Sequence, residues 1–126
     1  MRYDPVMTPG QPTSPMSPPP HRSRPVPSSV LHRIREELGP TELWLFGSRA
    51  RGDANDASDW DILAVVPDDT PPESLELPRL WARLRDLRLQ RVDVFPVTRA
   101  DFDVARYELG TLCQIATTEG VRLDGA

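Results

Sequence analysis

Residues 46–62, FGSRARGDANDASDWDI, place four aspartates within nine positions, directly after a Gly-Ser pair and two arginines. Like charges this close repel one another, so the sequence needs a reason to keep them together. A solvated turn explains the first two aspartates, because Asp and Asn favour turns. It explains Asp59 and Asp61 poorly, since they flank Trp60 at the start of an apolar run.

The run DWDILAVV, residues 59–66, predicts a β-strand. Side chains alternate across a strand, so Asp59 and Asp61 are expected on one face and Trp60 on the other. Two carboxylates a few ångströms apart ionise cheaply only if a cation neutralises them. Hard divalent ions such as Mg²⁺ suit this pair, since they take one or two carboxylates together with phosphate oxygens.

Two other interpretations of the loop fail. A calcium-binding EF-hand loop that starts at Asp53 needs an oxygen ligand at position 5, glycine at position 6 and glutamate at position 12. The chain has Ala57, Ser58 and Ala64 at these positions. The tripeptide Arg-Gly-Asp at residues 51–53 also occurs in cell-adhesion proteins, but three residues recur by chance and nothing here indicates export.

The residues before the loop are suited to binding phosphate. TELWLFG, residues 41–47, predicts a strand that ends in Gly47, and Ser48 opens a short helical turn. Such a turn leaves backbone N–H groups free, and the glycine lets a ligand approach the main chain. Ser48 can donate its hydroxyl, while Arg49 and Arg51 can balance the charge of a triphosphate. A phosphate cradle beside a carboxylate pair is typical of metal-assisted phosphoryl or nucleotidyl transfer.

A third carboxylate is expected on a neighbouring strand. Asp93 in RVDVFPV, residues 91–97, is the candidate, although an aspartate at the start of a strand often faces solvent. Pro96 predicts that this strand lies near an edge of the sheet.

The remaining elements predict an α+β fold, a small mixed β-sheet packed against helices. One helix is expected from residue 28 to Gly39 and another from Pro78. A long helical stretch is expected over residues 99–120, either as one helix or as two helices divided at Gly110. Residues 121–124 can add a last strand. The apolar positions expected on the inner faces of the three helical stretches are Val30, Leu31, Ile34, Leu38; Leu80, Trp81, Leu84, Leu87; and Phe102, Ala105, Leu109, Leu112, Ile115.

Composition divides the chain into two parts. Residues 1–27 hold nine of the 15 prolines and few aliphatic side chains, which predicts a disordered Pro-rich tail. Residues 28–126 form the predicted domain, with 12 arginines, no lysine and 18 acidic residues, hence a net charge near −6. This balance argues against a surface that binds duplex DNA tightly. No segment can span a bilayer, and Cys113 is the single cysteine, so a cytoplasmic protein is expected.

The stretch LFGSRARGDANDASDWDILAVV resembles the signature of the DNA polymerase beta-like nucleotidyltransferase superfamily. That signature is Gly-Ser, ten residues, then Asp-x-Asp, and here it is Gly47-Ser48, residues 49–58 and Asp59-Trp60-Asp61. The chain most resembles the minimal nucleotidyltransferases (MNT), which contain little beyond the catalytic core. Trp60 is bulkier than the aliphatic residue usual at its position.

The resemblance implies a role for each residue. Gly47 and Ser48 would hold the β- and γ-phosphates of a nucleoside triphosphate, ATP by analogy with the family, with help from Arg49 and Arg51. Asp59 and Asp61 would bind two Mg²⁺ ions. Asp93 would share one ion and help to deprotonate the acceptor hydroxyl.

The resemblance also suggests a partner. Larger relatives carry an additional domain for the acceptor, and a chain of this length is expected to find its acceptor on another protein. MNT proteins often pair with a HEPN-type ribonuclease toxin, which they neutralise by binding or by adding AMP to a tyrosine. The prediction is therefore a Mg²⁺-dependent protein adenylyltransferase that acts as an antitoxin. The alternatives are an antitoxin that neutralises by contact alone and a dimeric nucleotidyltransferase that modifies a small molecule.

Overall fold

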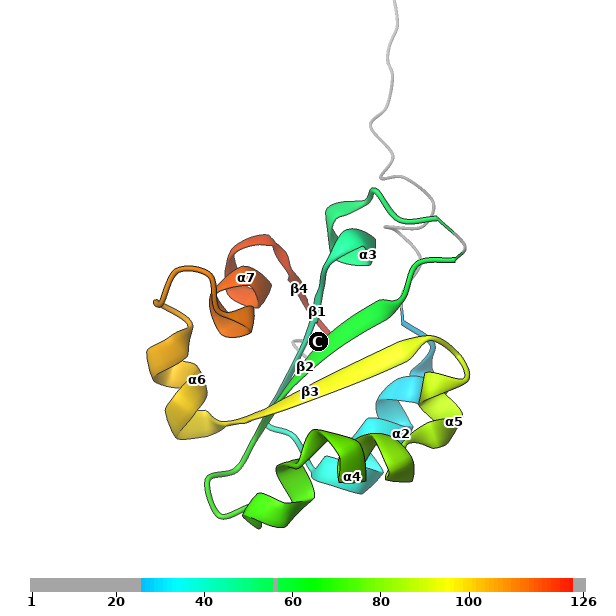
Figure 1. Cartoon of the computed structure of the whole chain (residues 1–126). Helices are drawn as coiled ribbons and strands as arrows, with labels where there is room; N and C mark the ends of the chain where they lie inside the picture. Colours follow the sequence, from blue (N-terminus) through cyan, green and yellow to red (C-terminus); the bar gives the residue numbers. More distant parts are fainter. Residues whose placement is uncertain (1–25, 56, 124–126) are drawn as a thin grey trace, which may run out of the picture.

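The structure is a computed structural model that describes residues 26–55 and 57–123 (Figure 1). The predicted tail, residues 1–27, lies outside the described residues except for Val26 and Pro27. Val26 is buried in the core. In chain order the elements are α2 Ser28–Leu38, β1 Glu42–Phe46, α3 Ser48–Arg51, β2 Trp60–Val66, the 3₁₀ helix η1 Pro72–Leu75, α4 Leu77–Arg83, α5 Arg85–Arg88, β3 Val92–Thr98, α6 Arg99–Ala105, α7 Leu112–Glu119 and β4 Val121–Arg122.

The four strands form one mixed sheet in the order β3-β2-β1-β4, which confirms the predicted fold class. β1 pairs antiparallel with β2 and with β4, whereas β2 and β3 run parallel. Parallel neighbours need a crossover connection, and here η1, α4 and α5 provide it. β3 lies at the edge of the sheet, as Pro96 predicted.

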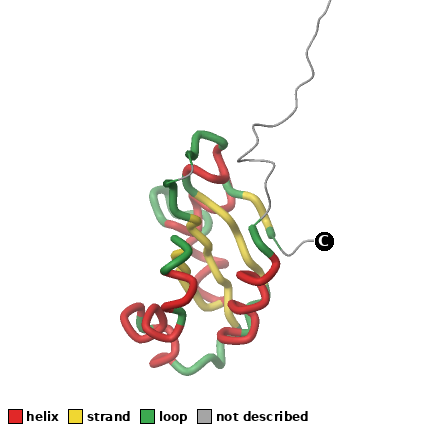
Figure 2. The backbone as a smooth tube through the Cα atoms, turned by 90° about the vertical axis from the view of Figure 1, so that its right-hand side faces the viewer, coloured by secondary structure: helices red, strands yellow, loops and turns green. Residues whose placement is uncertain are grey.

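Helices cover both faces of the sheet (Figures 1 and 2). On one face α2, α4 and α5 pack over the larger core cluster, and on the other α6 and α7 pack over a smaller one. Side chains alternate along β1, so that Leu43 and Leu45 face the larger cluster while Trp44 and Phe46 face the smaller. Among the described residues, no helix is both long and apolar enough to cross a bilayer.

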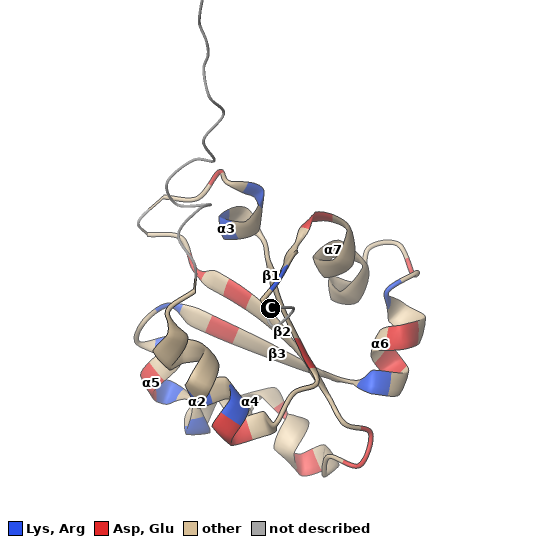
Figure 3. Ribbon diagram, turned by 180° about the vertical axis from the view of Figure 1, so that it is seen from behind, with Lys and Arg blue, Asp and Glu red and all other residues tan. Residues whose placement is uncertain are grey.

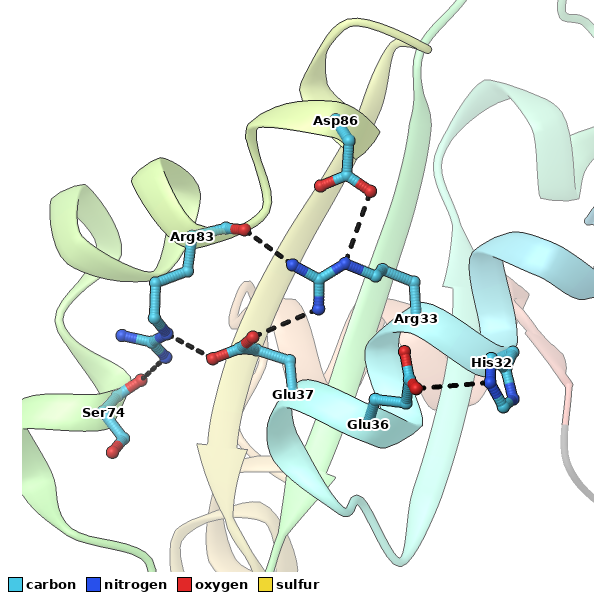
Figure 4. Close-up of polar contacts among 7 residues, drawn as sticks. All are labelled: His32, Arg33, Glu36, Glu37, Ser74, Arg83 and Asp86. Atoms are coloured by element: carbon cyan, nitrogen blue, oxygen red, sulfur yellow. Dashed lines mark hydrogen bonds and ion pairs between the residues drawn. The ribbon is translucent and has the colours of Figure 1, made fainter.

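A polar network fastens α2 to the crossover helices (Figure 4). Arg33 donates to Glu37 Oε1 at 3.1 Å and to the Arg83 carbonyl at 2.9 Å. Arg83 in turn donates to Glu37 and to the Ser74 carbonyl. Burial alone would raise the pKa of Glu37, but the hydrogen bonds from Arg83 and Arg33 outweigh it and hold that pKa below its ordinary value. The network fixes the layer on which β2 and β3 rest.

The structure corrects several details of the helices and strands. The helix predicted from Pro78 is two helices separated at Leu84, whose backbone leaves helical geometry. The stretch over residues 99–120 is also two helices, and Gly110 lies between them with φ of +90°. The strand predicted from residue 59 begins at Trp60. The last strand spans two residues, and the end of its predicted range, residue 124, lies outside the described residues.

Leu109 and Leu112 were predicted to be buried, and this prediction is wrong. Leu109 is 91% exposed and Leu112 is 42% exposed. The chain leaves α6 before it reaches them, and Thr111 starts a new helix by accepting a hydrogen bond from the Gln114 N–H. A continuous helix would have kept both leucines on the inner face, and the break turns them outward.

Phe102 anchors the smaller core cluster, and we expect Phe102→Ala to lower the free energy of unfolding by about 3–4 kcal/mol. Its ring is completely buried, and it packs against Trp44 at a centroid distance of 6.4 Å. Urea unfolding at neutral pH measures the change. Val104→Ala on the same helix is the control, since Val104 is 63% exposed and its truncation should cost about 0.5 kcal/mol or less. A similar small cost for both variants would show that this cluster adds little stability.

Candidate active site

Strand pairing brings two of the predicted carboxylates together. Asp61 on β2 lies opposite Asp93 on β3 in the parallel register. Figure 3 shows acidic residues, in red, side by side on these neighbouring strands. Trp60 belongs to the larger core cluster, whereas Leu63 and Val65 belong to the smaller one. Because side chains alternate, Asp61 lies on the face that α6 and α7 cover. It is the second residue of β2, before the apolar residues of that strand begin.

The Gly-Ser turn touches this carboxylate directly. Phe46 lies opposite Asp61 in the antiparallel register, so Gly47 follows β1 next to it. A Cβ atom built on Gly47 would lie 2.5 Å from Asp61 Oδ2, and the φ of Gly47 is +79°. Both facts require glycine here. α3 follows at once, and the N–H groups of Ala50 and Arg51 donate to the Gly47 carbonyl at 3.1 and 3.0 Å.

Asp61 is held in an environment that disfavours its charge. Burial raises the pKa of Asp61 to about 6, the negative charges of Asp93 and Asp59 add to this rise, and Arg51 opposes it. A carboxyl surrounded in this way gains from a nearby cation, because the cation offsets both the burial and the repulsion.

The other two carboxylates are held by arginines. Asp93 Oδ1 lies 3.1 Å from Arg88 NH1, and Asp59 Oδ1, just before β2, lies 3.7 Å from Arg91 NH1. Within residues 26–55 and 57–123 no three His, Cys, Asp or Glu side chains converge closely enough to hold a metal ion. The ion pairs give a physical reason, since each arginine draws one carboxylate toward itself. The donor set, three carboxylates beside a phosphate-binding turn, still fits the chemistry of Mg²⁺.

The Arg49 side chain is buried and makes its contacts within the protein. It is only 5% exposed, and its Nε and NH2 groups donate to the Ser58 carbonyl at 3.1 and 2.8 Å. Its guanidinium also lies 4.2 Å from the centre of the Trp60 ring. These contacts close the loop that leads into Asp59. Phosphate binding by Arg49 stays a prediction.

We expect Arg49→Met to lower the free energy of unfolding by about 1–3 kcal/mol, because it leaves the part-buried Ser58 carbonyl without the two N–H groups that Arg49 donates to it. Arg49→Lys should recover only part of this, since an ammonium group cannot make the two-pronged contact. Urea unfolding without nucleotide checks this, with Arg35→Met at an exposed position as the control. If the unfolding of Arg49→Met matched that of the wild type, the loop closure described above would carry no stability.

Arg51 and Ser48 lie at the two ends of α3. Arg51 makes ion pairs with Asp53 at 3.3 Å and with Glu119 at 3.2 Å, and all three side chains are about half exposed. Arg51 therefore joins the end of α3 to the end of α7 while lying close enough to lower the pKa of Asp61. Its role toward a triphosphate stays a prediction, as does that of Ser48. Asp56 of the same loop lies outside the described residues.

The sequence reasoning missed Arg88 and Arg91, the two arginines that pair with Asp93 and Asp59. The available signal was their place, with Arg91 at the first position of the third predicted strand and Arg88 three residues before it. That signal is weak, because which carboxylate an arginine meets depends on the packing of α5 against β3.

A glycine-serine turn that touches a carboxylate, with a second carboxylate on the next parallel strand, places this fold in the class of nucleotidyltransferases. Comparison with known families agrees, because the model of the nucleotidyltransferase domain matches residues 28–115. The chain belongs to this family, whose general reaction is the transfer of a nucleoside monophosphate.

Other comparisons add less. No curated protein matches the chain in sequence. Among solved structures, a protein from Sulfolobus solfataricus named as a "putative nucleotidyltransferase" is 21% identical to the chain. The alignment covers 75% of this chain and 72% of that one, with a TM-score of 0.49.

Proposed function

We propose that the chain transfers AMP from ATP to a hydroxyl group of a partner protein, with Asp59, Asp61 and Asp93 as the catalytic carboxylates. The observation that carries the proposal is the position of Asp61, which lies against Gly47 and opposite Asp93. A triphosphate bound at the Gly-Ser turn would have its phosphates next to these carboxylates.

The residues of the turn and the strands have separate tasks in this proposal. Gly47 admits the phosphates, and the Ser48 hydroxyl and the backbone of α3 donate to them. Asp59, Asp61 and Asp93 would hold two Mg²⁺ ions, which would neutralise phosphate charge and stabilise the attacking and leaving oxygens. Hard oxygen donors and the raised pKa of Asp61 both support a divalent cation at this place.

The reaction needs one proton acceptor. Asp93 takes the proton of the acceptor hydroxyl, and the oxygen attacks the α-phosphorus of ATP. The new O–P bond forms while the bond between the α-phosphorus and the bridging oxygen breaks, and pyrophosphate leaves. Arg88, whose NH1 lies 3.1 Å from Asp93 Oδ1, orients this carboxylate for that task.

We further propose that the partner is a HEPN-type ribonuclease toxin and that the chain is its MNT-type antitoxin in the cytoplasm. This part rests on the resemblance of residues 45–66 to the minimal nucleotidyltransferases and on the family match. In such a pair the acceptor hydroxyl would belong to a tyrosine of the toxin.

The test is label transfer from α-³²P-ATP in Mg²⁺, with and without a candidate HEPN-type partner protein. Asp59→Asn/Asp61→Asn is the inactive variant, and Asp69→Asn at an exposed turn position is the matched control. We expect label on the partner with the wild type and the control, and none with the double variant.

The other outcomes separate the alternatives. Inhibition of the partner without label, retained by the double variant, would mean neutralisation by contact alone. Transfer to a small molecule in the absence of any partner protein would mean that the acceptor is not a protein.

A further inference from the structure

A cavity of about 400 Å³ opens beside the carboxylates, on the side where α5 leads into β3. It is lined by Asp59, Arg88, Leu89, Arg91 and Asp93. Two of these are the predicted catalytic carboxylates, and the other three, Arg88, Leu89 and Arg91, form a surface that we call the arginine pocket. An acceptor in this cavity would lie next to Asp93, the proposed proton acceptor.

Arg91 has an unfavourable backbone. Its φ is +63°, and among the described residues it alone combines a side chain with a positive φ. Two hydrogen bonds hold it there: its N–H donates to the Arg88 carbonyl at 3.0 Å, and its carbonyl accepts from the Trp60 N–H at 2.8 Å. Glycine would suit this position better, so the presence of arginine indicates that its side chain serves a purpose there.

Arg88 is oriented by its neighbours. Its guanidinium lies 4.3 Å from the centre of the Trp81 ring, and Trp81 is fixed by a 2.9 Å hydrogen bond to the Val94 carbonyl. One guanidinium nitrogen pairs with Asp93. A guanidinium has five N–H donors in a planar fork, so this pairing still leaves a surface that fits a further carboxylate.

The rest of the pocket suits an acidic peptide. Leu89 is 78% exposed between the two arginines and offers an apolar contact. Arg91 is 62% exposed, and its pairing with Asp59 at 3.7 Å is long, so a competing carboxylate can replace it at little cost. Because residues 28–126 carry a net charge near −6, a polyanion such as nucleic acid is repelled overall, whereas one or two carboxylates meet the two arginines locally.

We propose that the arginine pocket binds a segment of the acceptor protein in which glutamate or aspartate residues flank the modified hydroxyl. This inference rests on the proposed function, because it concerns the acceptor of the same reaction. Arg88 and Arg91 would bind the acidic side chains, and Leu89 would contact an apolar neighbour. The pocket thereby selects which hydroxyl comes close to Asp93.

The test measures peptide binding and needs no catalysis. Two fluorescent peptides carry a central tyrosine, flanked by glutamates in one and by glutamines in the other. Fluorescence anisotropy with Mg²⁺ and without ATP gives the dissociation constants at low and high salt. We expect the glutamate peptide to bind about tenfold more tightly at low salt, with a smaller difference at high salt.

Three variants make the test specific. Arg91→Gly relieves the backbone strain, so this variant should be at least as stable as the wild type. Arg91→Gly and Arg88→Gln, tested as separate variants, should each remove the preference for glutamate. Arg85→Gln, on the same helix but outside the pocket, should keep it. Equal binding of the two peptides by the wild type would overturn the proposal, as would a preference that survives in both pocket variants.

The pocket and the proposed function can fail separately. Label transfer to a partner without any preference for glutamate would support the function and reject the pocket. A preference for glutamate that depends on Arg88 and Arg91, without any transfer, would support the pocket and reject the function.

Discussion

Asp61→Asn is expected to reduce nucleotidyl transfer by about 10³-fold or more, the largest effect of any single substitution in this chain. Asp61 lies against the Gly-Ser turn and opposite Asp93, so it lies between the proposed phosphate site and the proposed proton acceptor. An amide keeps the shape but loses the charge. Metal-assisted charge stabilisation contributes several kcal/mol, which corresponds to this loss of rate. The measurement is initial rate of label transfer at saturating ATP.

The same substitution should stabilise the protein in the absence of divalent metal. Between the ordinary carboxyl pKa of 3.8 and about 6, the unfolded chain has lost the Asp61 proton while the folded chain keeps it. The free energy of unfolding therefore falls as the pH rises through this window and remains lower above it. Asparagine removes this loss, so Asp61→Asn should be more stable at pH 7.5 by about 1 kcal/mol, after allowance for partial solvent screening.

Urea unfolding in EDTA at pH 4 and pH 7.5 tests the sign, with Asp69→Asn as the control. The gain from Asp61→Asn should appear at pH 7.5 and shrink toward pH 4, where Asp61 of the wild type is largely protonated. Asp69→Asn, at an exposed turn position, should keep the activity of the wild type. A variant that lost activity but was less stable at pH 7.5 would show that Asp61 is a structural residue.

The sheet and the place of the carboxylates could be predicted because they follow from local periodicity. Alternation along residues 42–46 separates Leu43 from Trp44 in the sequence as in the structure. The sequence pattern also predicted Asp61 and Asp93 near the starts of two apolar strands. The parallel register of these strands then places the two residues opposite each other.

The parts that sequence reasoning missed depend on tertiary contacts. The contact between Arg49 and Ser58 was not foreseen: the loop folds back, and its Ser58 carbonyl accepts from Nε and NH2 of the buried guanidinium. Leu109 fits a helical stripe, but α6 ends at Ala105 and leaves Leu109 exposed. Arg88 and Arg91 pair with Asp93 and Asp59 only because α5 packs beside β3. The periodicity of apolar residues does not predict these contacts between distant segments.

Gly47→Ala is expected to reduce nucleotidyl transfer by about 10²-fold while the fold survives. The added Cβ would lie 2.5 Å from Asp61 Oδ2, a distance that forces the carboxylate to move. Because that oxygen is the end of a side chain, it can give way without disrupting the sheet. A displacement of about 1 Å in a reacting group is enough for a loss of this size. Stability should fall by about 1–2 kcal/mol, since alanine disfavours the φ of +79°.

Gly39→Ala separates the two causes, because Gly39 also has a positive φ, +57°, but nothing lies within 4 Å of an added Cβ. Gly39→Ala should therefore lose some stability in urea unfolding but keep its activity. Gly47→Ala should lose activity and more stability, because its ψ of −160° lies in a region that only glycine readily adopts. If both lost activity in proportion to stability, the defect would come from backbone strain alone. If neither lost activity, the contact between Gly47 and Asp61 would have no part in the reaction. A selective loss at Gly47 would locate the phosphates of the nucleotide between this turn and the carboxylate of β2.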